Sequence, residues 1–220
     1  MQKLKTTALA CVISLLPILG HASVITFDDA LSWNGTQSSH VKNFSSGGFN
    51  FNLLGTGATL TDTQACTPLC PVNGTNIALV PYGPSSLFMA KSDHGTFSLI
   101  GFQGTGSFNF NSTRWGTDNM PDNIDVIGQL SGGGTVTQSF QIDKASIING
   151  ALSFSNYAFN DSFTNLLSAS FSSRGSADAL YNGFAIDNIA VASVPEPETY
   201  TLLLAGLAAI GGIALRRKPY

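Results

Sequence analysis

Apolar and polar residues alternate along much of the chain, as they do in half-buried β-strands. The alternation is clearest at residues 48–53, Gly-Phe-Asn-Phe-Asn-Leu, and it recurs on both sides of a glycine-rich break between Phe97 and Phe110. A period of two residues places successive side chains on opposite faces of a strand. We therefore expect strands in both regions, interrupted in the second by the glycines.

Two alternating runs at 123–130 and 135–142 flank the segment Ser131-Gly132-Gly133-Gly134. Glycine adopts positive φ without steric cost, so this pattern predicts a β-hairpin with a glycine turn. Phosphate binding by these glycines is disfavoured, because no helical pattern follows to supply a helix N-terminus.

Further strand candidates lie at 24–27, 151–154, 166–171 and 183–191, separated by segments rich in Gly, Asn and Ser. Residues 23–193 show no helical period. Several short strands with such turns predict a single all-β domain, an antiparallel β-sandwich, over these residues.

The chain begins with a basic segment containing Lys3 and Lys5, followed by an apolar run at 8–20. This order is typical of a signal peptide, and the small residues of Gly20-His21-Ala22 predict cleavage before Ser23. We assign residues 1–22 to the signal peptide. An uncleaved anchor is the alternative, but the run is shorter than the roughly 20 residues that span a membrane.

The other end has three parts in order: Val194-Pro195-Glu196-Pro197-Glu198, an apolar stretch at 200–215, and a basic tail at 216–220. The prolines favour an extended, accessible segment. The apolar stretch predicts a short transmembrane helix, and the basic residues favour the cytoplasmic side. An ordinary permanent anchor remains the alternative.

This tripartite tail, residues 194–220, resembles the PEP-CTERM sorting signal of Gram-negative bacteria. The resemblance implies that signal peptidase and an exosortase process the chain during export. The exosortase would recognise Pro195, Glu196 and Pro197 and remove the transient inner-membrane anchor. The body would then reach the cell surface or the extracellular matrix.

The body between the two ends is mildly acidic and poor in charge. Residues 23–193 contain no Glu, eleven Asp and five basic residues, without a Lys/Arg stripe. Such a surface repels phosphate backbones, so we do not expect a nucleic acid partner. Asp118, Asp122 and Asp125 do not have EF-hand spacing, and we interpret them as an acidic surface loop.

Cys66 and Cys70 are the only cysteines left after removal of the signal peptide. An even number of cysteines in an oxidising compartment favours a disulfide that closes a small loop. A metal site would need further ligands, and His40 and His94 lie in unrelated segments.

The opening Ile25-Thr26-Phe27-Asp28-Asp29 and the closing residues 184–189, Phe-Ala-Ile-Asp-Asn-Ile, resemble the terminal strands of jelly-roll, carbohydrate-binding-module-like and lectin-like domains. In those folds the two terminal strands share one sheet. The resemblance implies a structural Ca²⁺ between Asp28 or Asp29 and Asp187, since Ca²⁺ prefers oxygen ligands. Alternatively, Asp28 and Asp29 cap a turn, and Asp187 faces water or binds backbone.

The body offers little catalytic chemistry: it lacks Glu, has few histidines and has no Gly-x-Ser-x-Gly nucleophile elbow. Trp115 is our candidate for a ring that stacks on a sugar. We therefore expect an exported, non-catalytic β-sandwich associated with exopolysaccharide or biofilm. The alternatives are a structural or adhesive matrix protein without a ligand site, and a secreted hydrolase.

Overall fold

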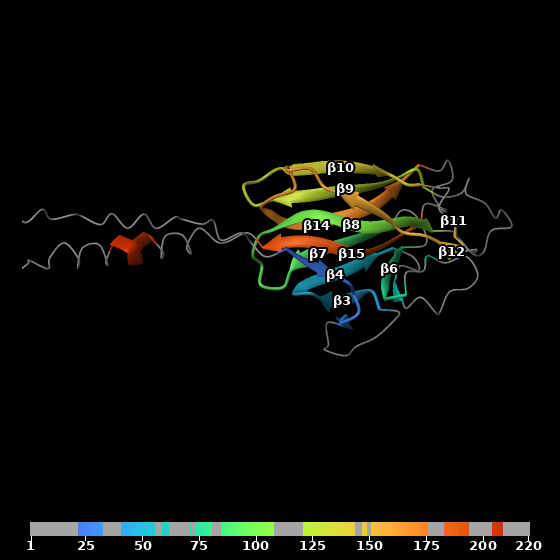
Figure 1. Ribbon diagram of the computed structural model, residues 1–220, viewed down its shortest axis with the longest axis horizontal. Coiled ribbons are helices and arrows are strands. Elements are labelled where there is room, and N and C mark those ends of the chain that lie inside the picture. The colour runs from blue at the N-terminus through green and yellow to red at the C-terminus, as the bar shows by residue number, and fades with distance from the viewer. Residues whose placement is uncertain are drawn as a thin grey trace, which may run out of the picture.

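The protein is an antiparallel all-β structure, as the sequence predicts (Figure 1). The computed structural model describes residues 22–32, 41–55, 59–61, 71, 74–80, 85–107, 121–143, 147–148, 151–175, 183–193 and 204–208. Their strands are β1 (Ala22–Ile25), β2 (Leu31–Ser32), β3 (Asn43–Ser46), β4 (Phe49–Leu54), β5 (Thr59–Thr61), β6 (Ile77–Val80), β7 (Ser86–Lys91), β8 (Phe97–Ser107), β9 (Asn123–Leu130), β10 (Thr135–Gln141), β11 (Ile147–Ile148), β12 (Ala151–Leu152), β13 (Ser155–Ala158), β14 (Leu166–Arg174) and β15 (Gly183–Ser193).

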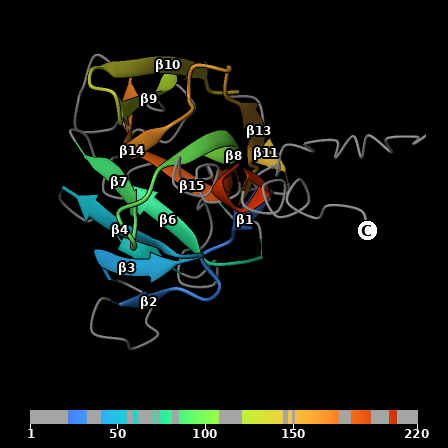
Figure 2. The ribbon, with the colours of Figure 1, turned by 90° about the vertical axis from the view of Figure 1, so that its left-hand side faces the viewer.

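The main sheet folds over on itself into two layers (Figure 2). In the first layer the strand order is β2-β3-β4-β7-β14-β9-β10. In the second layer β8 lies between β13 and β15, while β6 and β1 pair with opposite ends of β15. The layers are joined where Leu166 of β14 pairs with Phe97 of β8.

Phenylalanine rings fill the space between the layers. Phe102 of β8 meets Phe171 of β14 edge to face, with ring centroids 5.4 Å apart. Phe97 of β8 packs in the same way on Phe49 of β4 at 5.0 Å. Such pairs add about 0.5–1.5 kcal/mol each beyond area burial. The core of this small domain therefore accounts for much of the chain's Phe content.

The predicted hairpin is confirmed. Residues 123–129 of β9 pair in register with 135–141 of β10. Gly133 and Gly134 have φ values of 90° and 83°, the region that glycine adopts without strain.

The predicted glycine break in β8 is wrong, because the strand is continuous from Phe97 to Ser107. A Cβ on Gly101 would lie 2.6 Å from the carbonyl oxygen of Tyr157, and one on Gly104 would lie 2.8 Å from the Phe102 ring. The glycines therefore allow β13 and a core ring to approach β8 closely, and they do not end the strand.

Strands β2, β3, β5, β6, β7, β11 and β13 were not predicted. In β6 all four side chains are buried and no alternation is visible. The reason is that β6 is covered on both faces: Ala78 and Val80 join the main core, while Ile77 and Leu79 pack with Ala185 and Phe154 in a second, smaller cluster.

The first and last strands of the body lie side by side. Residues 22–25 of β1 pair antiparallel with residues 189–192 of β15, as the jelly-roll resemblance implies. Beyond the body, residues 204–208 form a helix inside the expected apolar stretch. Within the described part of the chain, no helix has the length and apolar character needed to cross a membrane. Residues 1–21 and the remainder of the expected transmembrane stretch lie outside the described residues.

Candidate functional site

Two β-bulges of opposite sense interrupt the pairing of β15 with β8. Asp187 pairs with Gln103 and Ala190 with Gly101, so two residues of β15 oppose one residue of β8. The next pair, Val191 with Leu99, leaves an extra residue on β8 and restores the register. Bulges change the direction of side chains and are common beside functional sites.

The bulge on β15 places Asn188 in the left-handed region, with φ of 50°. Asparagine tolerates this conformation better than most residues. The Asn188 Nδ2 atom donates a hydrogen bond to Gln103 Oε1 at 2.7 Å, and Gln103 Nε2 donates to Asn156 Oδ1 at 3.1 Å. We call Asn188, Gln103 and Asn156 the amide row; it crosses β15, β8 and β13.

The amide row lines a surface groove of about 370 Å³ on the outer side of the second layer. The adjoining wall is apolar, and Val24 of β1 is 56% exposed there. Among the described residues that line the groove, none has a side chain with a formal charge at neutral pH. The other lining residues are Val24, Gly101, Phe102, Tyr157 and Ala190.

Tyr157 forms a fixed wall of this groove. Its ring packs against Phe102 and Phe140, with centroid distances of 5.1 and 5.4 Å. Burial raises the pKa of the Tyr157 phenol. The phenol is therefore neutral at physiological pH.

Two of the predicted calcium ligands approach one short segment. Asp187 is fully buried, and its Oδ2 atom accepts a hydrogen bond from Thr75 Oγ1 at 2.8 Å. Asp28 Oδ1 accepts a hydrogen bond from the backbone N–H of the next residue, Asn76, at 3.2 Å. The first and last strands are thus linked through residues 75 and 76, next to the amide row.

Asp29 is bound elsewhere. Its carboxylate accepts hydrogen bonds from the Ser46 hydroxyl and from the Gly47 backbone N–H, in the turn between β3 and β4. Within the described ranges, no three His, Cys, Asp or Glu side chains form a group that could hold a metal ion. The oxygens at Asp28, Thr75 and Asp187 are nevertheless of the type that Ca²⁺ prefers, so calcium stays a prediction for these residues and not for Asp29.

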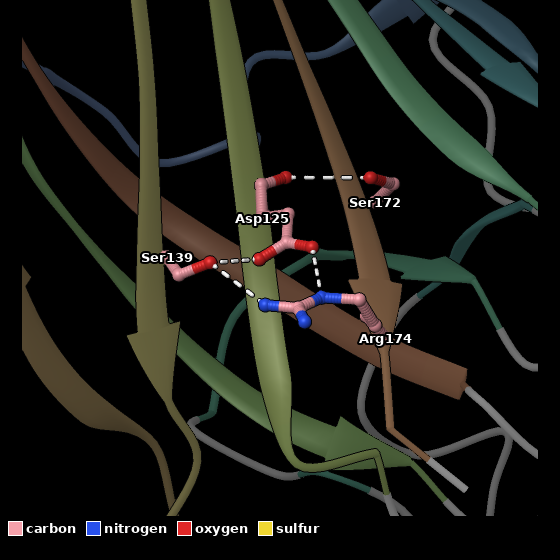
Figure 3. A network of polar contacts seen from close by, with 4 residues as sticks. All are labelled: Asp125, Ser139, Ser172 and Arg174. Atoms are coloured by element: carbon pink, nitrogen blue, oxygen red, sulfur yellow. Dashed lines mark hydrogen bonds and ion pairs between the residues drawn. The ribbon is translucent and has the colours of Figure 1, made fainter. Parts of the chain in front are cut away.

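A second polar cluster lies on the outer side of the first layer (Figure 3). Arg174 Nε of β14 donates to Asp125 Oδ2 of β9 at 2.8 Å, and Arg174 Nη2 donates to Ser139 Oγ of β10 at 3.3 Å. Ser139 also donates to the other oxygen of the Asp125 carboxylate. The Ser172 hydroxyl donates to the Asp125 backbone carbonyl at 3.4 Å. The cluster therefore cross-links three neighbouring strands.

This cluster corrects the prediction of an acidic surface loop. Asp125 belongs to β9, and Asp122 directly precedes that strand; Asp118 lies outside the described residues. Partial burial acts to raise the pKa of Asp125, but hydrogen bonds from Arg174 and Ser139, with the charge of Arg174, outweigh burial and lower it. The same carboxylate raises the pKa of Arg174. Both groups are charged at neutral pH.

The remaining predicted site residues lie outside the described ranges: Cys66, Cys70, Trp115, Pro195, Glu196 and Pro197. The amide row was missed by sequence reasoning. Its one local indication is the polar pair Asp187-Asn188 inside an apolar strand pattern, which is typical of a bulge.

The C-terminal prediction is confirmed by comparison with known families. Residues 193–218 match the PEP-CTERM protein-sorting motif. A motif of this kind marks an exported protein for processing by an exosortase. The comparison with curated proteins gave no match.

Three solved structures are similar to parts of the chain. The enzymatically active domain of tailspike protein 4 from bacteriophage CBA120 is 17% identical at a TM-score of 0.33, over 67% of this chain and 20% of that one. The CBM22-1-GH10 modules of the Clostridium thermocellum xylanase Xyn10B, complexed with xylohexaose, are 10% identical at 0.36, over 78% and 28%. The C-terminal family 22 carbohydrate-binding module of Xyn10B is 11% identical at 0.33, over 74% and 97%. This chain therefore spans only about a fifth of the tailspike domain.

Proposed function

We propose that the chain is an exported protein whose jelly-roll-like body associates, without catalysis, with exopolysaccharide at the cell surface or in the surrounding matrix. The observation that carries this proposal is the amide row in an uncharged groove. The sorting motif supports it independently, because it directs the body to the compartment where such polymers occur.

The groove has the chemistry that a neutral polyhydroxylated chain requires. Each side-chain amide offers both donors and acceptors, and a sugar hydroxyl is likewise a donor and an acceptor. The mutual hydrogen bonds of Asn188, Gln103 and Asn156 hold the three amides in place before a ligand binds. Less side-chain entropy is then lost on binding. The exposed Val24 offers an apolar contact for the C–H face of a sugar ring.

Binding is favoured over catalysis because of the groups that line the groove. Glycoside hydrolysis usually employs a pair of carboxylates, and proton transfer near neutral pH needs a group that titrates there. The described lining supplies uncharged amides, and the phenol oxygen of Tyr157 is buried. A catalytic site elsewhere in the chain would turn over a polysaccharide, so steady release of reducing ends by the purified protein would contradict this part of the proposal.

Calcium would strengthen the same region. We propose that Asp28 and Asp187, with Thr75, hold a Ca²⁺ ion that ties the turn after β1 to β15. The ion would fix the strand that carries Asn188. Thus its role would be structural.

The proposal is tested by retention of the purified protein on immobilised exopolysaccharide from the producing bacterium. Asn156→Ala removes the exposed end of the amide row, and we expect retention to fall at least tenfold. Gln141→Ala is the matched control, because it removes an exposed amide from β10 of the other layer. Equal retention of both variants and the unmodified protein would contradict a role for the groove. Failure of every form to bind would favour a structural or adhesive protein without a ligand site.

A further inference from the structure

The outer side of the first layer carries mainly small, uncharged polar residues, with exposed apolar side chains among them, in rows that cross the strands. The strands β3, β4, β7, β14, β9 and β10 lie in this order (Figure 1). Their register brings one outward residue of each into a single row. The row is Asn43, Asn52, Phe88, Ser170, Ile127 and Thr137.

Serines occupy outward positions of β14, the central strand of these rows. Ser168, Ser170 and Ser172 are partly exposed and alternate with the buried Ala169 and Phe171. Outward residues of one strand are about 6.6 Å apart, so the three hydroxyls form a regular line. We call the outward residues of β7, β14 and β9 around this line the serine face: Ser86, Phe88, Ala90, Ser168, Ser170, Ser172, Arg174, Asp125, Ile127 and Gln129.

Two apolar side chains rise on either side of the serine line. Phe88 of β7 is 38% exposed and Ile127 of β9 is 45% exposed. Both pair with the same residue, Ser170, so they stand about 10 Å apart across two strand spacings. An exposed aromatic ring beside a line of hydroxyls offers one apolar contact and several hydrogen bonds at once.

The serine face carries no net charge. Among the described outward positions of β4, β7, β14 and β9, the charged residues are Asp125 and Arg174, which neutralise each other at 2.8 Å (Figure 3). Nucleic acid and anionic membrane surfaces require unpaired basic residues, whereas the basic residue among these positions, Arg174, is paired with Asp125. A protein partner is also disfavoured, because serine is depleted in protein interfaces. These properties are complementary to a neutral, hydroxyl-rich polymer.

We propose that the serine face binds a second chain of neutral polysaccharide, with Phe88 as the ring that packs on a sugar. This inference rests on the proposed function, since it assigns a second site for the same class of ligand. The groove lies on the outer side of the second layer and the serine face on the outer side of the first. A single body therefore holds two polymer chains and cross-links the matrix.

Cross-linking is measured with two populations of beads, labelled with different dyes and coated with the neutral fraction of the bacterial exopolysaccharide. The purified protein should join beads of the two colours. Phe88→Ala should raise the protein concentration needed for this at least tenfold, while retention on a single polysaccharide column falls by less than about threefold. Phe88→Tyr keeps the ring and should behave as the unmodified protein does. Ser170→Lys, a surface change that blocks the hydroxyl line, should act as Phe88→Ala does, which guards against a folding defect in one variant.

The outcomes separate this inference from the proposed function. If Phe88→Ala and Ser170→Lys both join beads as well as the unmodified protein, while Asn156→Ala abolishes retention, the groove binds polysaccharide and the serine face does not. If no form is retained on the column, the proposed function itself fails. Beads coated with the acidic fraction should be joined poorly, and preferential joining of those beads would overturn the assignment of a neutral ligand.

Discussion

Single residues set the position of the groove. Asn188 occupies a left-handed conformation that costs most non-glycine residues about 1–2 kcal/mol. The bulge that requires this conformation also directs the Asn188 amide to Gln103. Local backbone strain and the candidate site therefore coincide at one residue, as they often do at functional sites.

At the same scale, the Asp125–Arg174 pair predicts how the stability of the protein depends on pH. A carboxyl whose pKa is lowered by folding stabilises the protein above its unfolded pKa of about 3.9, and this contribution is lost as the pH falls through the folded pKa. Arg174→Gln should therefore lower the melting temperature slightly at pH 7, and the difference should shrink below about pH 3.9. Thermal unfolding followed by circular dichroism checks this. A difference that grows in acid would contradict the assigned sign.

At the scale of elements, local patterns predict the longest strands but not the short ones or the groove. The hairpin of β9 and β10 follows from alternation and three glycines that lie within a few residues of one another. The amide row joins residues 103, 156 and 188, and its register depends on two bulges. Pairing of strands so distant in sequence is determined by the whole fold, so the groove could not be predicted from local patterns.

The glycines of β8 are a second case in which a contact between distant strands could not be predicted from local sequence patterns. They also lead to a prediction. A Cβ at position 101 would meet the carbonyl oxygen of Tyr157 at 2.6 Å, which forces β13 away from β8. Gly101→Ala should therefore destabilise the fold by about 1–3 kcal/mol and widen the groove. Gly132→Ala is the control, since nothing lies within 4 Å of a Cβ in that turn. Chemical denaturation measures both variants, and equal stabilities would show that β13 accommodates a side chain at position 101.

At the scale of the whole molecule, the start and the end of the body lie together. Ala22 pairs with Ala192 and Ile25 with Ile189, so the expected signal peptidase site and the sorting motif leave from neighbouring strands. The terminal motifs were predicted from sequence because each is a continuous segment. Composition predicted the two-layer arrangement only as a fold class, the β-sandwich.

We predict that calcium binds where the start and the end of the body lie together. If Asp28 and Asp187 hold Ca²⁺, millimolar calcium should raise the melting temperature of the purified protein, and Asp187→Asn should abolish the increase. Asp29→Asn should keep it, because Asp29 binds the turn between β3 and β4. Absence of both a thermal shift and a calorimetric signal with calcium would exclude the site.

The central claim is that the amide row contacts polysaccharide, and nuclear magnetic resonance of its side-chain amides tests this most directly. On titration with the neutral exopolysaccharide fraction, the side-chain N–H signals of Gln103, Asn156 and Asn188 should shift together along one saturable curve. The side-chain amide of Gln141, at the end of β10 and outside both the groove and the serine face, serves as the reference and should stay in place. Saturable shifts elsewhere in the protein, with the three amide-row signals unchanged, would contradict the account.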